Sequence, residues 1–292
     1  MRPSFTAQTM ALQRAMETAR PERSRLFSDP LATAFLSGPL RGAAALVRAP
    51  LLGRVAPRLY DLIWPGPRPS AVVRTRLIDD AIEAAVGDGI DQMVILGAGF
   101  DSRAWRLDTL RRARVIEIDR DETQAMKVEA LRRVHAPVDS VRFVPVDFEH
   151  DDLESALRAA ELDTAKPALF LWEGVTNYLT AEAVDHTLEI VRRLSAPGST
   201  LVFTFVHSGV LDGTVKFPEA DRWVRSVAKV GEPWTFGLNP ADLRGYLDDR
   251  GFELLWEEST AAAGRRYFAP TGRADRASEL YRVAAARVVC PG

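Results

Sequence analysis

Largely apolar runs alternate with longer amphipathic stretches through the middle of the chain. In the stretches between two runs, apolar positions recur at helical spacing. Strand-like runs that alternate with helical stretches are typical of βαβ units and a parallel sheet. The predicted strands are residues 93–96, 115–118, 141–146, 168–172 and 200–206.

The first part of the chain shows helical rather than alternating spacing. Residues 6–19 predict a helix that ends before Pro21. Asp29 and Pro30 predict a second helix over residues 31–36, because Asp is a common N-cap and Pro favours the first helical position.

A Pro-rich turn at residues 65–69 is the predicted internal boundary, after a further helical stretch at residues 51–63. Ser70 is then expected to cap a longer helix. We therefore expect a helical lid, or substrate cap, over residues 1–69. A Rossmann-like domain is expected over residues 70–292.

The last part of the chain predicts a helix and two more strands. Asn239 and Pro240 are expected to open the helix, which Gly251 closes. The strands are residues 252–256 and 281–289, with a loop rich in Gly and Arg before the second. The predicted fold is thus α/β, a doubly wound and mostly parallel sheet with helices on both faces.

Composition narrows the function classes. The chain has 292 residues, 38 Lys and Arg against 40 Asp and Glu, and a net charge of −2. A nucleic-acid partner, including an RNA substrate, would favour a basic excess, so none is expected. The single Cys290 cannot form an internal disulfide, and the four histidines lack metal-ligand spacing, so no metal is expected. Without an apolar signal segment or spanning run, we expect a cytoplasmic protein without a membrane partner. The oligomeric state is not predicted.

The turn Gly97-Ala98-Gly99 follows a predicted buried strand, and Asp119 ends the next strand about 20 residues later. Glycines let a backbone approach a ligand closely, and a carboxylate at this spacing is typical of a ribose contact. A dinucleotide motif would continue to a third Gly, where this chain has Ser102. That difference favours S-adenosylmethionine over NAD. An NAD-dependent oxidoreductase and a non-catalytic sensor of an adenosine ligand stay open on these residues alone.

Here the sequence resembles the leucine carboxyl methyltransferase-like family, a branch of the class I S-adenosylmethionine-dependent methyltransferases. The resemblance covers roughly residues 6–210. Within the family, the sequence is similar to the bacterial members. The resemblance rests on segments that occur in family order: residues 23–36, VRTR at 73–76, LGAGFDSR at 96–103, WRL at 105–107, EID at 117–119, VPVDF at 144–148 and WEGVTNY at 172–178.

The resemblance implies a seven-stranded sheet with one antiparallel strand, for which residues 281–289 are the candidate. It also implies O-methyl transfer from S-adenosylmethionine to a carboxylate, either of a small-molecule natural product or of a peptide C-terminus. Which of these is the acceptor stays open.

Cofactor contacts follow from the resemblance position by position. Arg74 matches the arginine that pairs with the methionine carboxylate, and Glu173 an acidic position beside the same moiety. Gly97, Ala98 and Gly99 match the turn beneath the cofactor. Asp119 matches the ribose ligand, whereas Asp147 and Phe148 match the pair that holds adenine.

Acceptor contacts are expected from two segments that would cover the site. In the N-terminal helices, Arg23 and Arg25, together with Arg14, are candidates to bind a carboxylate. In a cap insertion near residues 209–238, Trp223 and Trp234 are candidate pocket walls.

A carboxylate acceptor is already an anion and needs no general base. A phenol or hydroxyl acceptor would favour one, and His207, at the end of a predicted parallel strand, is the candidate. Tyr178 on the same rim is the second candidate catalytic residue, although a wall of the substrate pocket is the preferred interpretation.

Overall fold

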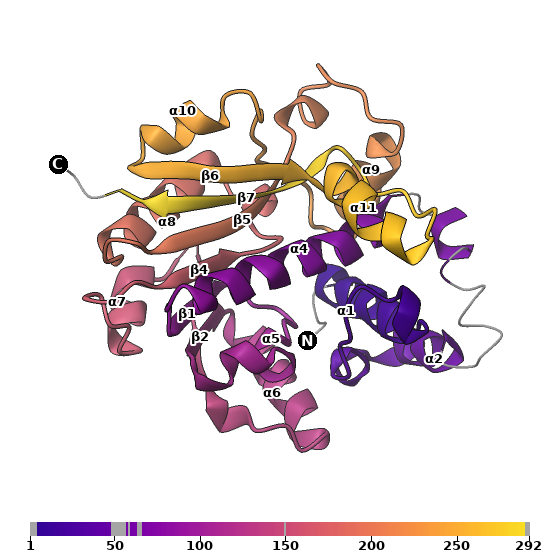
Figure 1. Cartoon of the computed structure of the whole chain (residues 1–292), viewed down its shortest axis with the longest axis horizontal. Helices are drawn as coiled ribbons and strands as arrows, with labels where there is room; N and C mark the ends of the chain where they lie inside the picture. The colour runs from indigo at the N-terminus through magenta and orange to yellow at the C-terminus, as the bar shows by residue number, and fades with distance from the viewer. Residues whose placement is uncertain (1–4, 48–56, 58, 63–65, 149, 290–292) are drawn as a thin grey trace.

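The computed structural model describes residues 5–47, 57, 59–62, 66–148 and 150–289. A seven-stranded sheet crosses the molecule in the order β3-β2-β1-β4-β5-β7-β6 (Figure 1). The strands are β1 Gln92–Leu96, β2 Arg114–Asp119, β3 Val141–Pro145, β4 Leu169–Trp172, β5 Thr200–Val206, β6 Phe252–Ser259 and β7 Tyr281–Val288.

Only β7 runs against its neighbours. The pairs among β1 to β5 are parallel, whereas β7 is antiparallel to both β5 and β6. The chain moves outward from β1 through β2 to β3 and then returns to the other side of β1 as β4. Ligands of open α/β sheets bind at the carboxyl ends of the strands where the order reverses, here between β1 and β4.

Helices cover both faces of the sheet and also form the N-terminal part of the chain (Figure 1). Their bounds are α1 Phe5–Thr18, α2 Gly38–Val47, α4 Pro67–Gly87, α5 Arg103–Arg106, α6 Asp121–Arg133, α7 Leu153–Ala159, α8 Ala181–Arg193, α9 Ala220–Lys229, α10 Leu243–Asp248 and α11 Thr260–Phe268. Short 3₁₀ turns are η1 Glu22–Ser24, η2 Ala32–Phe35, η3 Asp108–Arg112, η4 Val138–Ser140, η5 Thr176–Tyr178, η6 Ser208–Val210 and η7 Ala269–Thr271.

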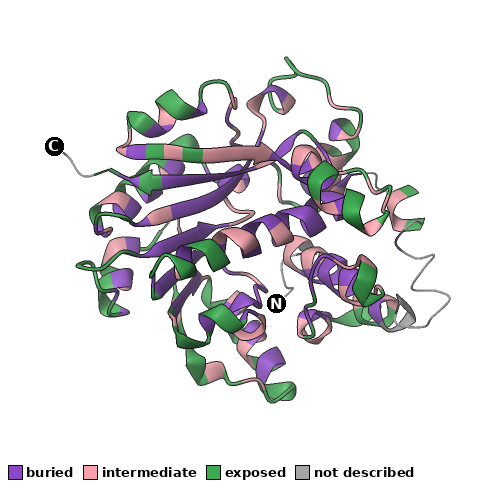
Figure 2. Ribbon diagram, viewed as in Figure 1, coloured by how far each residue is buried: buried purple, intermediate pink, exposed green. Residues whose placement is uncertain are grey.

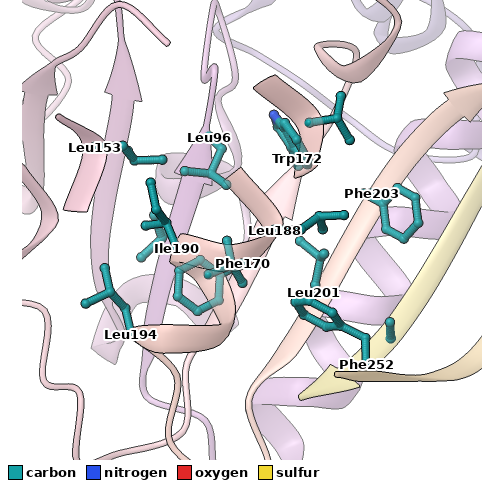
Figure 3. Close-up of a cluster of buried hydrophobic side chains, with 14 of the residues drawn as sticks. Leu96, Leu153, Phe170, Trp172, Leu188, Ile190, Leu194, Leu201, Phe203 and Phe252 are labelled. Atoms are coloured by element: carbon teal, nitrogen blue, oxygen red, sulfur yellow. The ribbon is translucent and has the colours of Figure 1, made fainter. Parts of the chain in front are cut away.

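The sheet separates two apolar cores. One lies beneath α7, α8 and α10, where Phe170 and Trp172 of β4 and Leu201 of β5 meet Leu188 of α8 (Figure 3). The other lies beneath α4, α5 and α11. The central strands are therefore buried on both faces, whereas the outer sides of the helices are exposed (Figure 2). Burial of both faces explains why these strands read as apolar runs rather than as alternating patterns.

The N-terminal helices pack on the domain rather than apart from it. α1 contacts α2, η2 and α4. Phe35 of η2 stacks on Phe100, which follows the glycine turn, with ring centroids 5.2 Å apart. A third apolar cluster joins these elements to Leu131 of α6. The N-terminal helices, which the sequence predicts to act as a lid, thus lie against the segment that follows β1.

The structure corrects several local predictions. Residues 31–36 contain the 3₁₀ turn η2 rather than an α-helix, although Asp29 still accepts a hydrogen bond from the Leu31 amide at 3.1 Å. The long helix begins at Pro67 after Gly66, so Ser70 lies inside it rather than capping it. The loop predicted before β7 contains α11, which packs on α4. Most of the helix predicted at residues 51–63 lies outside the described residues.

Candidate active site

The glycine turn after β1 has a shape that only glycine adopts easily. Gly97 has φ +68° and Gly99 has φ +48°, both in the left-handed region. A β-carbon added to Gly97 would lie 2.3 Å from Cγ2 of Val175, in the loop after β4. The turn therefore packs directly against the neighbouring strand's loop at the point where the strand order reverses.

Asp119, at the end of β2, is hydrogen-bonded to this turn. Its carboxylate accepts hydrogen bonds from the Gly99 amide at 2.5 Å and from the Arg120 amide at 2.7 Å. The Ala98 amide donates to the Ile118 carbonyl at 2.9 Å. Asp119 is half-buried, which suits a side chain that contacts a ligand at this edge.

Behind Asp119, a buried ion pair supports the end of β2. Glu117 is fully buried, and Lys127 of α6 donates to its carboxylate at 2.6 Å. Burial raises the pKa of Glu117 to about 7, although Lys127 opposes that shift. The pair ties β2 to α6 two residues before the candidate ribose contact.

Arg74 and Arg103 both donate hydrogen bonds to the carboxylate of Glu173, at the carboxyl end of β4. Nε of Arg74, from α4, donates to Glu173 at 2.7 Å, and Nη1 of Arg103, from α5, donates to the other oxygen at 2.6 Å. Burial by itself would raise the pKa of Glu173, but Arg103 and Arg74 together lower it. Glu173 is therefore ionised between two guanidinium groups.

Arg103 has two further acidic partners. Its Nε donates to Asp79 of α4 at 2.8 Å, and its Nη1 also bonds Asp101. Burial opposes ionisation of Asp101, but the positive charge of Arg103 lowers its pKa to about 2. We call Arg74, Arg103, Glu173, Asp79 and Asp101 the charged network.

One face of α1 covers the glycine turn. A β-carbon on Gly99 would lie 3.9 Å from Ala7, and Sδ of Met10 lies 3.5 Å from Nη2 of Arg74. One turn later, Arg14 donates to the Phe100 carbonyl at 2.6 Å. Because these α1 residues recur at helical spacing, they form one side of the helix facing the site.

A buried latch holds α1 in this position. Nε of Arg14 donates to Asp29 at 2.8 Å, and the same carboxylate oxygen accepts from Ser102 Oγ at 2.7 Å. Asp29 thus connects α1 to Ser102, in the segment that follows the glycine turn.

Asp147 and Phe148 lie at the same edge, directly after β3. The Val146 amide donates to the Asp119 carbonyl at 2.9 Å, which places the end of β3 beside the end of β2. Asp147 is half-buried, and the half-buried Phe148 ring packs against the core under α7 and α8. Both residues are therefore next to the candidate ribose contact.

On the other side of Glu173, three aromatic rings form a continuous surface. Trp223 of α9 stacks on Tyr281 of β7, with centroids 5.7 Å apart and planes within 15°. The ring centroid of Trp234 lies 5.6 Å from that of Trp223 and 6.4 Å from that of Tyr281. We call these three residues the aromatic wall. The aromatic wall contacts the charged network at Tyr281, because Cζ of Arg74 lies 4.8 Å from the centroid of the Tyr281 ring.

With this geometry in view, comparison with known proteins identifies the chain's family. Residues 7–192 match the family model described as leucine carboxyl methyltransferase. The chain belongs to the leucine carboxyl methyltransferase family. The family predicted from the sequence motifs is thereby confirmed.

Relatives and solved structures agree with this membership. A Frankia alni protein named "Putative S-adenosyl-L-methionine-dependent methyltransferase" is 37% identical over 270 residues, which cover 91% of this chain and 89% of that protein. A Streptomyces avermitilis protein of the same description is 34% identical, over 94% and 93% of the two chains. The crystal structure of a "putative methyltransferase" from Thermobifida fusca matches with a TM-score of 0.59 at 20% identity, over 94% of this chain and 97% of that one. That match shows the fold and confirms the predicted α/β class.

In this member of the leucine carboxyl methyltransferase family, the structure brings some predicted residues together and not others. Arg74 and Glu173 form an ion pair at the carboxyl end of β4, and Val175, two residues after Glu173, packs against Gly97 of the glycine turn. Arg23 is exposed, and Arg25 pairs with Glu22 at 3.7 Å rather than with a residue of the charged network. Arg14 is the N-terminal arginine that reaches the glycine turn.

His207 and Tyr178 have defined local roles. Nδ1 of His207 accepts from the Gly209 amide at 3.0 Å and caps η6, and its ring lies 5.6 Å from Phe217. Burial lowers the pKa of His207. Burial raises the pKa of Tyr178 to about 12, so its hydroxyl keeps its proton near neutral pH.

Sequence reasoning missed Asp79, Arg103 and Tyr281 as site residues. Arg103 ends the family motif that begins at Leu96, and this position was the available signal. Asp79 lies on the buried side of α4, where it interrupts the apolar spacing. Tyr281 was read only as the start of a strand, and nothing local distinguishes it.

Within the described residues, no group of three or more His, Cys, Asp or Glu side chains is arranged to hold a metal ion. No helix in the described part of the chain is both long and apolar enough to cross a membrane.

Proposed function

We propose that the protein is an S-adenosylmethionine-dependent O-methyltransferase that methylates a carboxylate of a small-molecule natural product or of a peptide C-terminus. The observation that carries this proposal is the placement of Arg74 and Glu173 beside the glycine turn. Family membership and the names of the relatives support the choice of cofactor.

The donor set fits the chemistry of this cofactor. The methionine end carries a carboxylate, which the positive Arg74 can bind, and an ammonium, which the negative Glu173 can bind. Both side chains are largely buried, which strengthens such pairing. Asp119 can accept from ribose hydroxyls at the end of β2. Asp147 can accept from the adenine amine, and Phe148 supplies an apolar face.

The chain's residues would bind and orient the reactants rather than move a proton. When bound, S-adenosylmethionine would supply an electrophilic methyl group with a neutral thioether as its leaving group, and Arg74, Glu173 and Asp119 would hold it. No proton is transferred, which agrees with a Tyr178 hydroxyl of raised pKa. Covered by α1, the site excludes water, and this strengthens orientation and charge effects.

Calorimetry on the full chain tests the cofactor assignment. We expect S-adenosylmethionine and S-adenosylhomocysteine to bind and NAD not to bind. Arg74→Ala should weaken binding of S-adenosylmethionine by about 10- to 100-fold, because a charge-assisted pair is lost. Arg74→Lys should restore only part of the loss, since an ammonium lacks the planar fork.

Arg76→Ala is the matched control. Arg76 lies on the same helix, pairs with Asp80 at 2.7 Å and has a side chain 40% exposed. We expect its removal to leave cofactor affinity within about twofold. Binding of NAD with no binding of S-adenosylhomocysteine would instead support the oxidoreductase alternative.

A further inference from the structure

The aromatic wall continues from the cofactor side of the site toward the cap. Arg74 lies over Tyr281, and a β-carbon on Gly174 would be 3.9 Å from both Nη2 of Arg74 and the Tyr281 hydroxyl. Trp223 and Trp234 then extend the surface away from Arg74. The wall thus begins where, under the proposed function, the methionine end of the cofactor is held.

Two buried N–H groups accompany this wall. Asn177 is fully buried, and its Oδ1 lies 3.4 Å from the Tyr281 hydroxyl, but its Nδ2 has no hydrogen-bond partner among the described residues. The indole Nε1 of Trp234 interacts with the Tyr178 hydroxyl, but in a geometry outside that of a normal hydrogen bond. The Thr235 amide donates to the Asn177 carbonyl at 2.9 Å, so the two segments are adjacent.

Buried donors without partners cost stability, and in a binding site they mark where a ligand's acceptor atoms go. The Arg74 guanidinium already occupies one face of Tyr281, which disfavours a second cation there. The charge of Arg74 and the N–H groups of Asn177 and Trp234 favour an anion rich in acceptor oxygens. Flat aromatic walls favour a flat body.

The lid limits the size of the acceptor. Thr6 of α1 donates a hydrogen bond to Glu232, in the loop that joins α9 to Trp234. This contact joins α1 to the segment that carries Trp234 of the aromatic wall. A compact acceptor could bind with the contact in place, whereas a peptide C-terminus would require it to open for the chain that precedes the terminus.

We propose that Trp223, Trp234 and Tyr281, with the N–H groups of Asn177 and Trp234, form the acceptor subsite for a small aromatic carboxylic acid. This inference rests on the proposed methyl transfer, and it chooses a small aromatic acid over a peptide C-terminus.

The experiment offers the full chain four acceptors together with S-adenosylmethionine labelled in its methyl group. These are cinnamate, 2-naphthoate, octanoate and a tetrapeptide with a free C-terminal leucine. We expect methyl-ester formation from the two aromatic acids, with kcat/KM on the order of tenfold or more above the other two. Asn177→Leu and Trp234→Phe should raise KM for the aromatic acids on the order of tenfold.

Binding of S-adenosylhomocysteine, measured by calorimetry on each variant, shows that the fold and cofactor site are intact. Trp234→Phe keeps a ring and removes only the N–H group. Its matched control is Tyr246→Phe on α10. This substitution removes a hydroxyl that donates a hydrogen bond to Asp185 of α8 at 2.7 Å. This control should leave KM unchanged.

Equal use of octanoate or of the peptide would overturn the inference, as would an unchanged KM in both Asn177→Leu and Trp234→Phe. Aromatic acids that neither form esters nor quench tryptophan fluorescence of the S-adenosylhomocysteine complex overturn it as well, while leaving the proposed function intact. A wild-type chain that binds no S-adenosylhomocysteine refutes the proposed function itself.

Discussion

Around the glycine turn the side chains that meet are charged, whereas across Glu173, toward α9 and β7, they are aromatic. Each ion in the charged network needs a partner in a fixed position, because an unpaired buried charge is costly. Ring contacts in the aromatic wall are less directional, and rings can be exchanged with smaller losses. The charged side is therefore expected to tolerate substitution less well than the aromatic side.

The sharpest test of this contrast removes the centre of the charged network. Arg103→Ala removes the cation shared by Asp79, Asp101 and Glu173. Arg106 still pairs with Asp79 and Arg74 with Glu173, but Asp101 loses its arginine partner, and we expect the free energy of unfolding to fall by about 3–5 kcal/mol. Urea denaturation measures this loss. Arg158→Ala, which removes an exposed pair with Glu154, should cost less than about 1 kcal/mol. Equal losses in the two variants would contradict a special role for buried charge.

The second test changes the turn on which the charged side is built. Gly97→Ala places a β-carbon against Val175 at a positive φ, and we expect a loss of about 2–4 kcal/mol in stability with weaker cofactor binding. Thermal denaturation and calorimetry measure the two effects. Adding Val175→Ala removes the clashing methyl but not the φ penalty, so it should restore only part of the loss. Complete rescue would show that φ is unimportant here.

The third test uses pH. Because the folded-state pKa of Glu117 is about 7 and its ordinary value is 4.5, the folded protein keeps a proton that the unfolded chain has released between these values. The associated stability is present below pH 4.5 and is lost as the pH rises through about 7. We expect the unfolding free energy of the wild type to fall by about 1–3 kcal/mol over this range relative to Glu117→Gln. Parallel pH profiles would assign the dependence to other groups.

The smallest effect is expected on the aromatic side. His207→Ala removes the acceptor that caps η6, and this should cost less than about 1 kcal/mol in thermal denaturation. Turnover of a carboxylate acceptor should stay within about twofold, since no base is required. A loss of about 100-fold or more would favour a phenol or hydroxyl acceptor with His207 as its base.

Much of the fold could be predicted because the central strands are buried on both faces. The bounds of β1 to β5 lie within one residue of the apolar runs in the sequence. α11 was missed because Gly264, Arg265 and Arg266 obscure its pattern. Only tertiary packing shows why this glycine is tolerated: a β-carbon there would lie 3.4 Å from both Ala277 and Phe268.

The charged side of the site was more predictable than the aromatic side. Arg74, Gly97 and Asp119 lie in short motifs whose chemistry is local. The aromatic wall is assembled from α9, the following loop and β7, and Tyr281 meets Trp223 only after the sheet has formed. For the same reason, the exposed position of Arg23 and the contact of Arg14 with the segment after the glycine turn depend on how the N-terminal helices pack.

The Arg14–Asp29–Ser102 latch has a consequence for the kinetics of the proposed enzyme. Under the proposed function, α1 would have to move aside for the cofactor to reach the glycine turn, so the measured affinity would be the intrinsic affinity reduced by the fraction of molecules in which α1 is displaced. A tighter latch would lower this population and would also delay departure of the spent cofactor. The stability of one buried ion pair thus sets a compromise between shielding the reaction and the frequency with which it repeats.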